Sequence, residues 1–500
     1  MEHQIDSTIQ KTTTMNSLNR RNFLKRSLLG AATVSFSARS WSQVAGANSA
    51  IRSAVVGFNG RGGSHINGLG GLSAQGVRMV GLCDVDSNVL QGGVSKLDKA
   101  GTRVDGYTDI RKLLERKDID VISIATPNHW HALATIWSVQ AGKDVYVEKP
   151  VCHNVWEGRK MVEAARKYKK IVQTGTQCRS SSGIREAVQW VQGGNLGKIT
   201  AARGLCYKPR GSIGKVEQDQ PIPESINYDL WCGPAPMDPL RRARLHYDWH
   251  WIWNYGNGDL GNQGIHQMDI ARWFLGENDL SPKVMSVGGR LGYVDDGETP
   301  NTQFVYHEYD SAPLIFEVRG LRENDSSKSM DKFPDAETGG SVGVVIHCEG
   351  GYVVVPNYDS AIAYDKDRKK IKQWRGSSDH FENFINAVRS RKTEDLAADI
   401  HEGYVSSSLC HTGNISYRLG SKRSSNEIRE EIKGSKQAFE TYERMQSHLE
   451  ANKIDLNNEK LTLGPMLSMN PNRRRFIGNT EANALLTRHY RRPYVVPEVV

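Results

Sequence analysis

The chain has 500 residues, of which 38% are hydrophobic, enough for two packed domains and too many for a wholly disordered protein. Its formal net charge is +9, but much of the excess lies in the first fifty residues and in arginine clusters near 473–475 and 488–492, so we expect no nucleic-acid partner. The seven cysteines form no C-x-x-C pair, which argues against a zinc cluster or a disulfide framework, and we expect no metal site.

The N-terminal segment has the pattern of an export signal. The stretch NRRNFLKRSLLGAATVSFSA joins Arg20 and Arg21 to a short apolar run, and Ala45-Gly46-Ala47 supplies small residues for cleavage. The run is too short to span a membrane. We expect residues 1–47 to be a twin-arginine signal and linker, and the mature protein to be periplasmic without stable membrane insertion. A disordered basic leader is the alternative.

Residues 51–176 alternate short β-branched runs with amphipathic segments. This alternation predicts parallel strands joined by crossover helices, an α/β domain of the doubly wound Rossmann type. The predicted strands cover 52–58, 77–84, 121–127, 144–150 and 170–176.

A glycine-rich turn follows the first predicted strand. It reads Gly57-Phe58-Asn59-Gly60-Arg61-Gly62-Gly63 and matches G-x-G-x-x-G at the first and third positions. We expect Gly57, Asn59, Gly60, Arg61 and Gly62 to bind a dinucleotide pyrophosphate, and Asp84, at the end of the second predicted strand, to bind its ribose hydroxyls. Asp84 favours NAD over NADP because it repels a 2′-phosphate, although Arg52 or Arg78 would change that balance. A glycine turn without nucleotide is the alternative.

Two further segments end predicted strands at the same edge of the sheet. In TPNHWHA, residues 126–132, we expect Thr126, Pro127, Asn128 and His131 to lie beside the nicotinamide, although helix capping explains Asn128 equally well. In VEKP, residues 147–150, Glu148 and Lys149 join the cofactor site, because the following proline biases Lys149 toward an extended backbone. A surface ion pair with Glu148 is the alternative for Lys149.

Residues 177–420 predict a second, α+β domain with a large, mainly antiparallel open sheet, which we expect to bury against another subunit in a homo-oligomer. The segment HYDWHWIWNYG, residues 246–256, alternates as an extended strand does, and Trp249 is a candidate to stack on a sugar. Helices are predicted near 378–391 and 400–418. Residues 421–500 predict a polar helix over 427–452 and an extended arm around this subunit or a neighbour. Strands are predicted over 283–294, 302–309, 313–320, 342–355 and 359–365.

The stretch GNGDLGNQGIHQMDIARWFLG, residues 256–276, predicts a loop that runs into a helix. Helical spacing places Asn262, His266 and Asp269 on one face, with apolar residues on the neighbouring stripe. Arg179, in a loop before a helix, is a candidate for binding substrate, or else packs at the helix N-terminus. Tyr207, Lys208, Arg210 and Tyr228 lie in a Gly/Pro-rich region typical of an active-site loop and are candidates for contacting substrate.

The segments VVGFNGRGGSH, CDVD, ATPNHWHA and EKPV, in this order, resemble the glucose-fructose oxidoreductase / inositol 2-dehydrogenase (Gfo/Idh/MocA) family, and residues 256–276 resemble its second motif. The resemblance implies an NAD(P)-dependent oxidoreductase acting on a sugar, polyol or glycoside, with Lys149 as the EKP lysine and His266 as the catalytic histidine. The family often has aspartate where this chain has Asn262, which puts its usual Lys-Asp-His triad in question. Asp269 is a possible substitute and, like Asn262, a candidate substrate ligand.

Hydride transfer from an alcohol needs a base for the hydroxyl proton, and both Lys149 and His266 qualify. We expect both to contact the reacting hydroxyl, and we favour His266 as the proton acceptor, with Lys149 as the residue that hydrogen-bonds the hydroxyl. Two other functions stay open. One is an NAD-dependent glycosidase that oxidises the sugar transiently. The other is a non-catalytic sugar or nucleotide sensor, which Asn262 and the altered glycine motif favour.

Overall fold

The computed structural model describes residues 50–334 and 340–500. The twin-arginine signal predicted within 1–47 lies outside the described residues. Within the described ranges, no helix combines the length and hydrophobicity that a membrane span requires.

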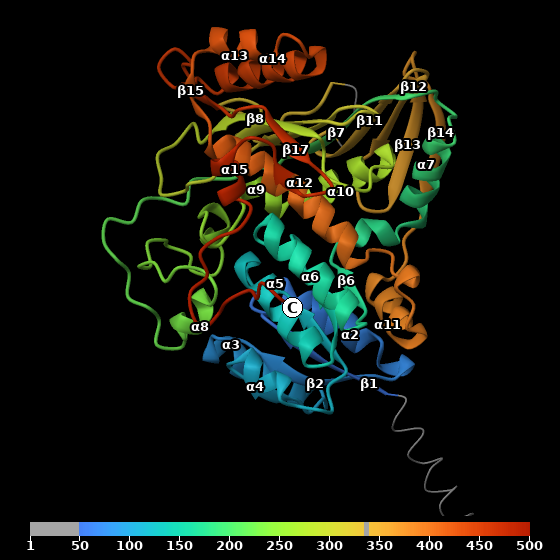
Figure 1. Ribbon diagram of the computed structural model, residues 1–500, viewed down its shortest axis with the longest axis vertical. Helices are drawn as coiled ribbons and strands as arrows, with labels where there is room; N and C mark the ends of the chain where they lie inside the picture. The colour runs from blue at the N-terminus through green and yellow to red at the C-terminus, as the bar shows by residue number, and fades with distance from the viewer. Residues whose placement is uncertain (1–49, 335–339) are drawn as a thin grey trace, which may run out of the picture. The chain divides into compact units, whose positions relative to one another are not determined.

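Residues 51–176 form a parallel six-stranded sheet in the order β3-β2-β1-β4-β5-β6 (Figure 1). The predicted doubly wound Rossmann domain is confirmed. Strands β1, β4 and β5 are buried almost throughout, as expected of a sheet covered on both faces. The strands are β1 (Ile51–Val56), β2 (Val77–Cys83), β3 (Asp105–Tyr107), β4 (Val121–Ile124), β5 (Asp144–Val147) and β6 (Val172–Thr174). The helices are α2 (Gly62–Gly71), α3 (Ser87–Lys99), α4 (Ile110–Leu114), α5 (Asn128–Gln140) and α6 (Val155–Lys167).

The second sheet has twelve strands, in the order β14-β13-β12-β11-β7-β10-β9-β8-β16-β15, with β17 also paired to β8 and β18 paired to β17. Strands β7 and β10 pair in parallel, and the other pairs described in this sheet are antiparallel, which confirms the predicted mainly antiparallel sheet. The strands are β7 (Ile199–Tyr207), β8 (Lys283–Gly289), β9 (Thr302–Glu308), β10 (Leu314–Arg319), β11 (Val342–Cys348), β12 (Gly351–Val355), β13 (Ser360–Asp365), β14 (Lys370–Arg375), β15 (Ser421–Arg423), β16 (Leu461–Leu463), β17 (Leu467–Asn470) and β18 (Arg475–Phe476).

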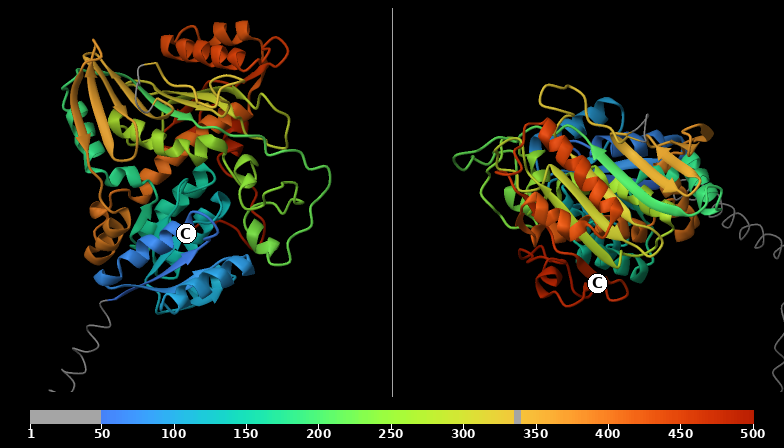
Figure 2. Two further views of the ribbon diagram at one scale, coloured as in Figure 1. Left: turned by 180° about the vertical axis from the view of Figure 1, so that it is seen from behind. Right: turned by 90° about the horizontal axis from the view of Figure 1, so that it is seen from above.

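Helices cover both faces of this sheet. On one face, α7 (Ser182–Gln192), α10 (Gly264–Leu275) and α12 (Ile400–Arg418) pack against the strands, and α12 also packs against α6 of the Rossmann domain. On the other face, α13 (Ser425–Ile432) and α14 (Lys436–Ala451) share a core with apolar residues of β8, β9 and β10 (Figures 1 and 2). The chain's own helices therefore occupy part of the face that we expected to meet another subunit. Oligomerisation itself stays a prediction.

The remaining helices are short or peripheral. They are α8 (Tyr228–Cys232), α9 (Gly258–Asn262), α11 (His380–Ser390), α15 (Thr480–Ala484) and the 3₁₀ turns η1 (Ser73–Gln75), η2 (Gln177–Ser180), η3 (Asp248–Trp251) and η4 (Thr393–Asp395).

Two predicted elements are wrong. The strand over 246–256 is replaced by η3, because local contacts favour a turn: the Asp248 carboxylate accepts hydrogen bonds from the backbone and side chain of Arg244 at 3.1 and 2.9 Å. The single helix over 427–452 is two helices, since Gly434 and Ser435 separate α13 from α14 and the Ser435 hydroxyl caps α14.

The C-terminal arm returns to its own Rossmann domain, one of the two arrangements predicted. After β16 has paired with β8, the chain leads to Tyr494, Val496 and Val500, which are buried in the core beside α5. The ring of Tyr494 lies 5.6 Å from that of Trp130.

Candidate cofactor and substrate site

A cavity of about 420 Å³ opens at the carboxyl ends of the Rossmann strands. It lies beside β1 and β4, where the strand order reverses, which is where open α/β sheets bind ligands. Its size suits a small-molecule site. The Rossmann side contributes residues 57–61, Asp84, 126–128, His131, Glu148 and Lys149. The opposite wall contributes Lys208, Arg210, Trp231, His246, Tyr247, Trp249, His250, Asn262 and Gln263.

The glycine turn has the shape of a pyrophosphate cradle. Gly57 has φ +75°, and a Cβ there would lie 2.8 Å from the Thr126 backbone. A Cβ on Gly62, the first residue of α2, would lie 2.1 Å from the Gly57 carbonyl oxygen, whereas one on Gly60 would meet nothing within 4 Å. The turn thus packs closely on the protein side and is open at Gly60, beside the N-terminus of a ten-residue helix. These residues fit a dinucleotide, because free N–H groups and the helix dipole favour phosphate there.

Asp84 follows β2 and lines the cavity, as the sequence predicts. Its carboxylate accepts backbone hydrogen bonds from Phe58 at 2.9 Å and Asp86 at 3.1 Å, and burial raises its pKa. Arg52 and Arg78 do not line the cavity, since they lie near the amino ends of β1 and β2, away from its carboxyl edge.

Glu148 forms a buried ion-pair network. Its Oε1 accepts hydrogen bonds from Arg61 Nε at 2.7 Å and from His65 Nε2 at 3.1 Å. Although burial raises the pKa of Glu148, His65 and Arg61 outweigh it and hold the pKa well below the usual value. Arg61, not Lys149, is therefore the ion-pair partner of Glu148, and the alternative of a surface pair between Glu148 and Lys149 is wrong.

Lys149 lines the cavity, and its Nζ donates a hydrogen bond to the backbone oxygen of Asn262 at 2.7 Å. Burial lowers the pKa of Lys149, with a smaller opposing effect from Glu148 and further lowering by Arg61 and Lys208. A lowered pKa is the property that a lysine needs to act as a base near neutral pH.

His266 lies behind the cavity wall. It is only 5% exposed and is not a lining residue. Burial, followed by the charge of Lys149, lowers the pKa of His266 to about 3. Its Nδ1 has no hydrogen-bond partner among the described residues, and its ring centroid lies 5.1 Å from that of Tyr358. A neutral, weakly basic imidazole is a better hydrogen-bonding group than a proton acceptor.

The predicted single helix is interrupted at Gln263, between α9, which ends at Asn262, and α10, in which His266 and Asp269 lie three residues apart. Asn262 lines the cavity. Asp269 instead faces Arg179, which donates two hydrogen bonds to it at 2.8 and 2.9 Å inside the domain. Neither member of this buried pair lines the cavity, so the structure does not support the predicted substrate contacts of Arg179 and Asp269.

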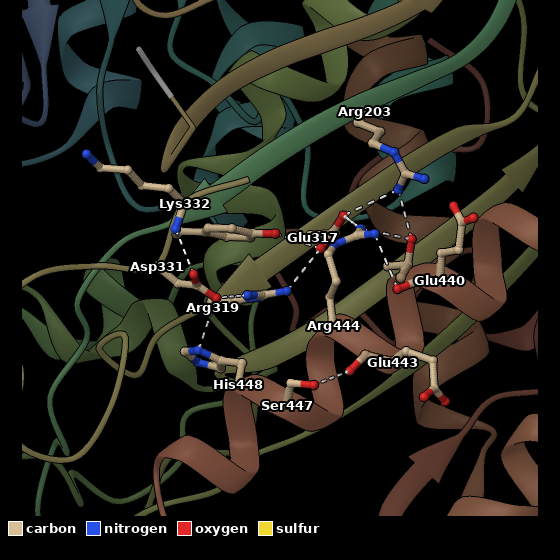
Figure 3. Close-up of polar contacts among 12 residues, drawn as sticks. Arg203, Glu317, Arg319, Asp331, Lys332, Glu440, Glu443, Arg444, Ser447 and His448 are labelled. Atoms are coloured by element: carbon tan, nitrogen blue, oxygen red, sulfur yellow. Dashed lines mark hydrogen bonds and ion pairs between the residues drawn. The ribbon is translucent and has the colours of Figure 1, made fainter. Parts of the chain in front are cut away.

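Tyr207 lies on the other side of the sheet. Its hydroxyl donates a 2.6 Å hydrogen bond to Glu317, which Arg203, Arg319 and Arg444 surround beneath α14 (Figure 3). We refer to these five residues as the Glu317 cluster. The structure thus corrects the predicted substrate contact of Tyr207. It is Lys208 and Arg210, just beyond the end of β7, that line the cavity.

The remaining predicted residues lie at the cavity. Thr126, Pro127, Asn128 and His131 line it, but Asn128 does not cap α5: its amide donates to Asn257 Oδ1 at 3.0 Å. The ring nitrogens of His131 lie 2.8 Å and 2.6 Å from the carbonyl oxygens of Thr126 and Pro150, so His131 braces these two turns.

Trp249 also lines the cavity, and its ring stacks on His250 at 3.7 Å. Stacking on a sugar stays a prediction. Lys208 and Arg210, which the sequence also offers as substrate contacts, line the cavity, and Asp259 accepts hydrogen bonds from Arg210 at 2.8 and 2.7 Å. Tyr228, offered with them, does not line it. Sequence reasoning missed Tyr247, Gln263, His246 and His250 as cavity residues, and His246 lies 3.1 Å from Asp86.

Two models of one family match the chain. "Oxidoreductase family, NAD-binding Rossmann fold" matches residues 51–176, and "Oxidoreductase family, C-terminal alpha/beta domain" matches residues 188–328. Together they match more than half of the chain, and the chain belongs to this Gfo/Idh/MocA family of NAD-binding oxidoreductases. The resemblance noted in the sequence is thereby confirmed.

Several characterised proteins are similar to parts of the chain. Inositol 2-dehydrogenase of Salmonella paratyphi B is 25% identical over 181 residues, 36% of this chain and 52% of the relative. A glycosyl hydrolase family 109 protein of Shewanella baltica is 30% identical over 181 residues, 31% of this chain and 39% of the relative. The chain thus spans about half or less of these relatives.

The fold is also that of solved structures. The WlbA dehydrogenase of Bordetella pertussis, in complex with NADH and UDP-GlcNAcA, matches with a TM-score of 0.52 at 20% identity, over 72% of this chain and 94% of that chain.

Proposed function

We propose that the protein is an NAD-dependent oxidoreductase that transfers a hydride between a carbon of a sugar, polyol or glycoside and the nicotinamide. The observation that carries this proposal is that the glycine cradle and the Lys149 amine line one cavity. The similarity to inositol 2-dehydrogenase supports a polyhydroxylated substrate.

NAD, when bound, supplies the nicotinamide carbon that accepts the hydride. The chain supplies the base: Lys149, as the neutral amine, accepts the proton of the substrate hydroxyl, and the Asn262 carbonyl fixes its direction. His266 serves as a hydrogen-bonding residue near Lys149 and not as the proton acceptor. This reverses our preference for His266 as the base, because the structure gives His266 a pKa of about 3 and places it behind the cavity wall.

NAD is the proposed cofactor rather than NADP. Asp84 lines the cavity at the carboxyl end of β2, where its charge would face a 2′-phosphate, whereas Arg52 and Arg78 do not line the cavity. Native mass spectrometry of the purified protein tests this choice. A co-purifying mass of NADP instead of NAD would contradict it.

The oxidoreductase proposal is tested by mixing NAD-loaded protein with a panel of sugars, polyols and glycosides while absorbance at 340 nm is followed. We expect at least one compound to generate NADH, and Lys149→Ala to abolish the signal while leaving cofactor binding intact. If sugars bind but none generates NADH or is transformed, the protein is a sensor, and the proposal is wrong.

A second candidate is a glycosidase that oxidises the sugar transiently, eliminates the aglycone and returns the hydride. The similarity to a glycosyl hydrolase family 109 protein favours it. Release of nitrophenol from aryl glycosides without net NADH would identify this activity, whereas stoichiometric NADH would identify a dehydrogenase.

We further propose that the protein is exported to the periplasm, on the strength of the Arg20-Arg21 pattern in the sequence. Replacing both arginines with lysine should retain the protein in the cytoplasm, as cell fractionation would show. Unchanged export of this variant would contradict the twin-arginine route.

A further inference from the structure

The end of the cavity beside Lys149 carries more positive than negative charge. Both nearby carboxylates have arginine partners within 3 Å: Arg61 binds Glu148 at 2.7 Å, and Arg210 binds Asp259 through two nitrogens at 2.8 and 2.7 Å. Within each pair the arginine neutralises the carboxylate, so neither carboxylate is available to neutralise another cation.

Lys208 is the cation left over. It is half-buried in the cavity wall, and its Nζ donates to the neutral side-chain oxygen of Gln263 at 3.1 Å. Among the described residues, no carboxylate lies within ion-pair distance of it. The ammonium group has three donors and uses one here, so two remain for a ligand. Holding a partly desolvated cation without a counterion costs free energy, which an anionic ligand would recover.

The cofactor is the first candidate for that anion, but its pyrophosphate has its own site. The glycine turn and the N-terminus of α2 supply that site from the Rossmann domain, whereas Lys208 and Gln263 belong to the opposite wall. Lys208 instead neighbours Lys149, since the two side chains donate to the consecutive residues Gln263 and Asn262 at 3.1 and 2.7 Å and line the same cavity. A group bound to Lys208 therefore lies next to the proposed base, where the substrate is expected.

We propose that the substrate is an acidic sugar, whose carboxylate binds the Lys208 ammonium while the hydroxyl to be oxidised faces Lys149. This inference rests on the proposed oxidoreductase function. A single carboxylate matches the single uncompensated ammonium. A phosphate dianion would need further cations, but Arg61 of the glycine turn and Arg210 of this wall are already paired with carboxylates.

Lys208 has a rival role, in which it only lowers the pKa of Lys149. The two roles differ in one measurable way. If Lys208 acts only through Lys149, its removal changes the pH profile for acidic and neutral sugars alike. If Lys208 binds the substrate, its removal erases the preference for the acidic sugar.

The test is calorimetric titration of NAD-loaded protein with matched pairs: methyl glucuronide against methyl glucoside, and methyl galacturonide against methyl galactoside. We expect the acid of at least one pair to bind at least tenfold more tightly than its neutral partner. Lys208→Gln should erase that preference, and Lys208→Arg should keep most of it. Lys215→Gln, at an exposed position of the same segment, should leave it unchanged.

The proposal is overturned if no acid is preferred, if none of the probes binds, if glucose 6-phosphate binds more tightly than every carboxylate, or if the preference survives in Lys208→Gln. Cofactor mass and NADH formation are measured on the same samples. NADH formed only from neutral sugars would refute the acidic substrate and leave the oxidoreductase function standing. Failure to retain any nicotinamide cofactor would refute the oxidoreductase function itself.

Discussion

The cavity and the Glu317 cluster use similar charged residues, yet the charges are balanced in one and unmatched in the other. In the cluster, one buried carboxylate is contacted by Arg444 at 2.6 Å, Arg203 at 3.4 Å and Arg319 at 3.5 Å, and α14 covers the group (Figure 3). In the cavity, the side-chain nitrogens of Lys149 and Lys208 donate only to neutral oxygen atoms among the described residues. Charge alone therefore does not mark a functional site. Access to a cavity does not mark one either, because Arg203 and Arg444 of the cluster line a second cavity of about 350 Å³. The informative feature is an unmatched charge.

The largest effect expected from this comparison is on catalysis. Lys149→Ala removes the proposed base, so the single-turnover rate of NADH formation should fall by about 10² to 10⁴-fold. Stopped-flow absorbance with NAD-loaded protein measures this rate. Lys215→Ala is the matched control and should react as the wild type does. An unchanged rate in Lys149→Ala would exclude Lys149 as the base.

The Glu317 cluster should respond in stability instead. Glu317→Ala removes the carboxylate that Arg203 and Arg444 share, whereas Arg319 keeps its ion pair with Asp331. The loss should lower the free energy of unfolding by about 3–5 kcal/mol, because the buried Arg203 is left without a partner carboxylate. Urea denaturation measures the loss, and Lys208→Gln, in the open cavity, should change stability by less than about 1 kcal/mol. Equal losses in the two variants would remove the distinction between a charge-balanced cluster and a site with an unmatched charge.

Asp84 combines a structural role with a binding role, because its carboxylate both holds the glycine turn and faces the cavity. Asp84→Asn removes the charge but keeps the shape, and we expect NAD to bind about tenfold more weakly, since a hydrogen bond to a charged group contributes about 1.5–3 kcal/mol. Fluorescence titration of cofactor-free protein with NAD and with NADP measures this. A larger loss for NADP than for NAD would contradict the role assigned to Asp84.

The smallest effect is on the pH profile. Because burial lowers the pKa of Lys149 and only the neutral amine accepts a proton, the rate should rise with pH and level off below the ordinary lysine pKa of 10.5. Lys208→Gln removes a neighbouring cation, raises the pKa of Lys149 and moves the profile to higher pH. His266, with a pKa of about 3, should add no inflection between pH 5 and 9. A shift toward lower pH in Lys208→Gln would contradict this arrangement.

The fold was largely predictable because its signals are local. Buried parallel strands appear as β-branched runs, and the glycine turn and EKP segment mark strand ends. Strand β3 was missed because three residues, Asp105–Tyr107, carry too short a pattern. The strand predicted over 246–256 was wrong because the aromatic residues alternate as in a strand, whereas contacts between Arg244 and Asp248 favour a turn.

The site was predictable most fully in its Rossmann half, although Trp249 and Asn262 of the second domain were also predicted and line the cavity. Those residues follow strands whose ends must meet at one sheet edge. The second-domain half depends on long-range partners: Arg179 is hydrogen-bonded to Asp269, 90 residues away, and Tyr207 is hydrogen-bonded to Glu317, 110 residues away. Nothing local distinguishes such residues from free ones. Lys208 and Arg210, just beyond the end of β7, could be separated from Tyr207 only by knowing that Tyr207 pairs with Glu317.

The packing of the C-terminal arm on α5 has a consequence for biogenesis. Trp130 and Trp137 emerge from the ribosome more than 350 residues before Tyr494, which covers their rings in the finished molecule. At ordinary elongation rates the surface formed by these two rings remains exposed for roughly tens of seconds while the rest of the chain is synthesised. A chaperone that shields aromatic surface during synthesis should therefore raise the yield of native protein.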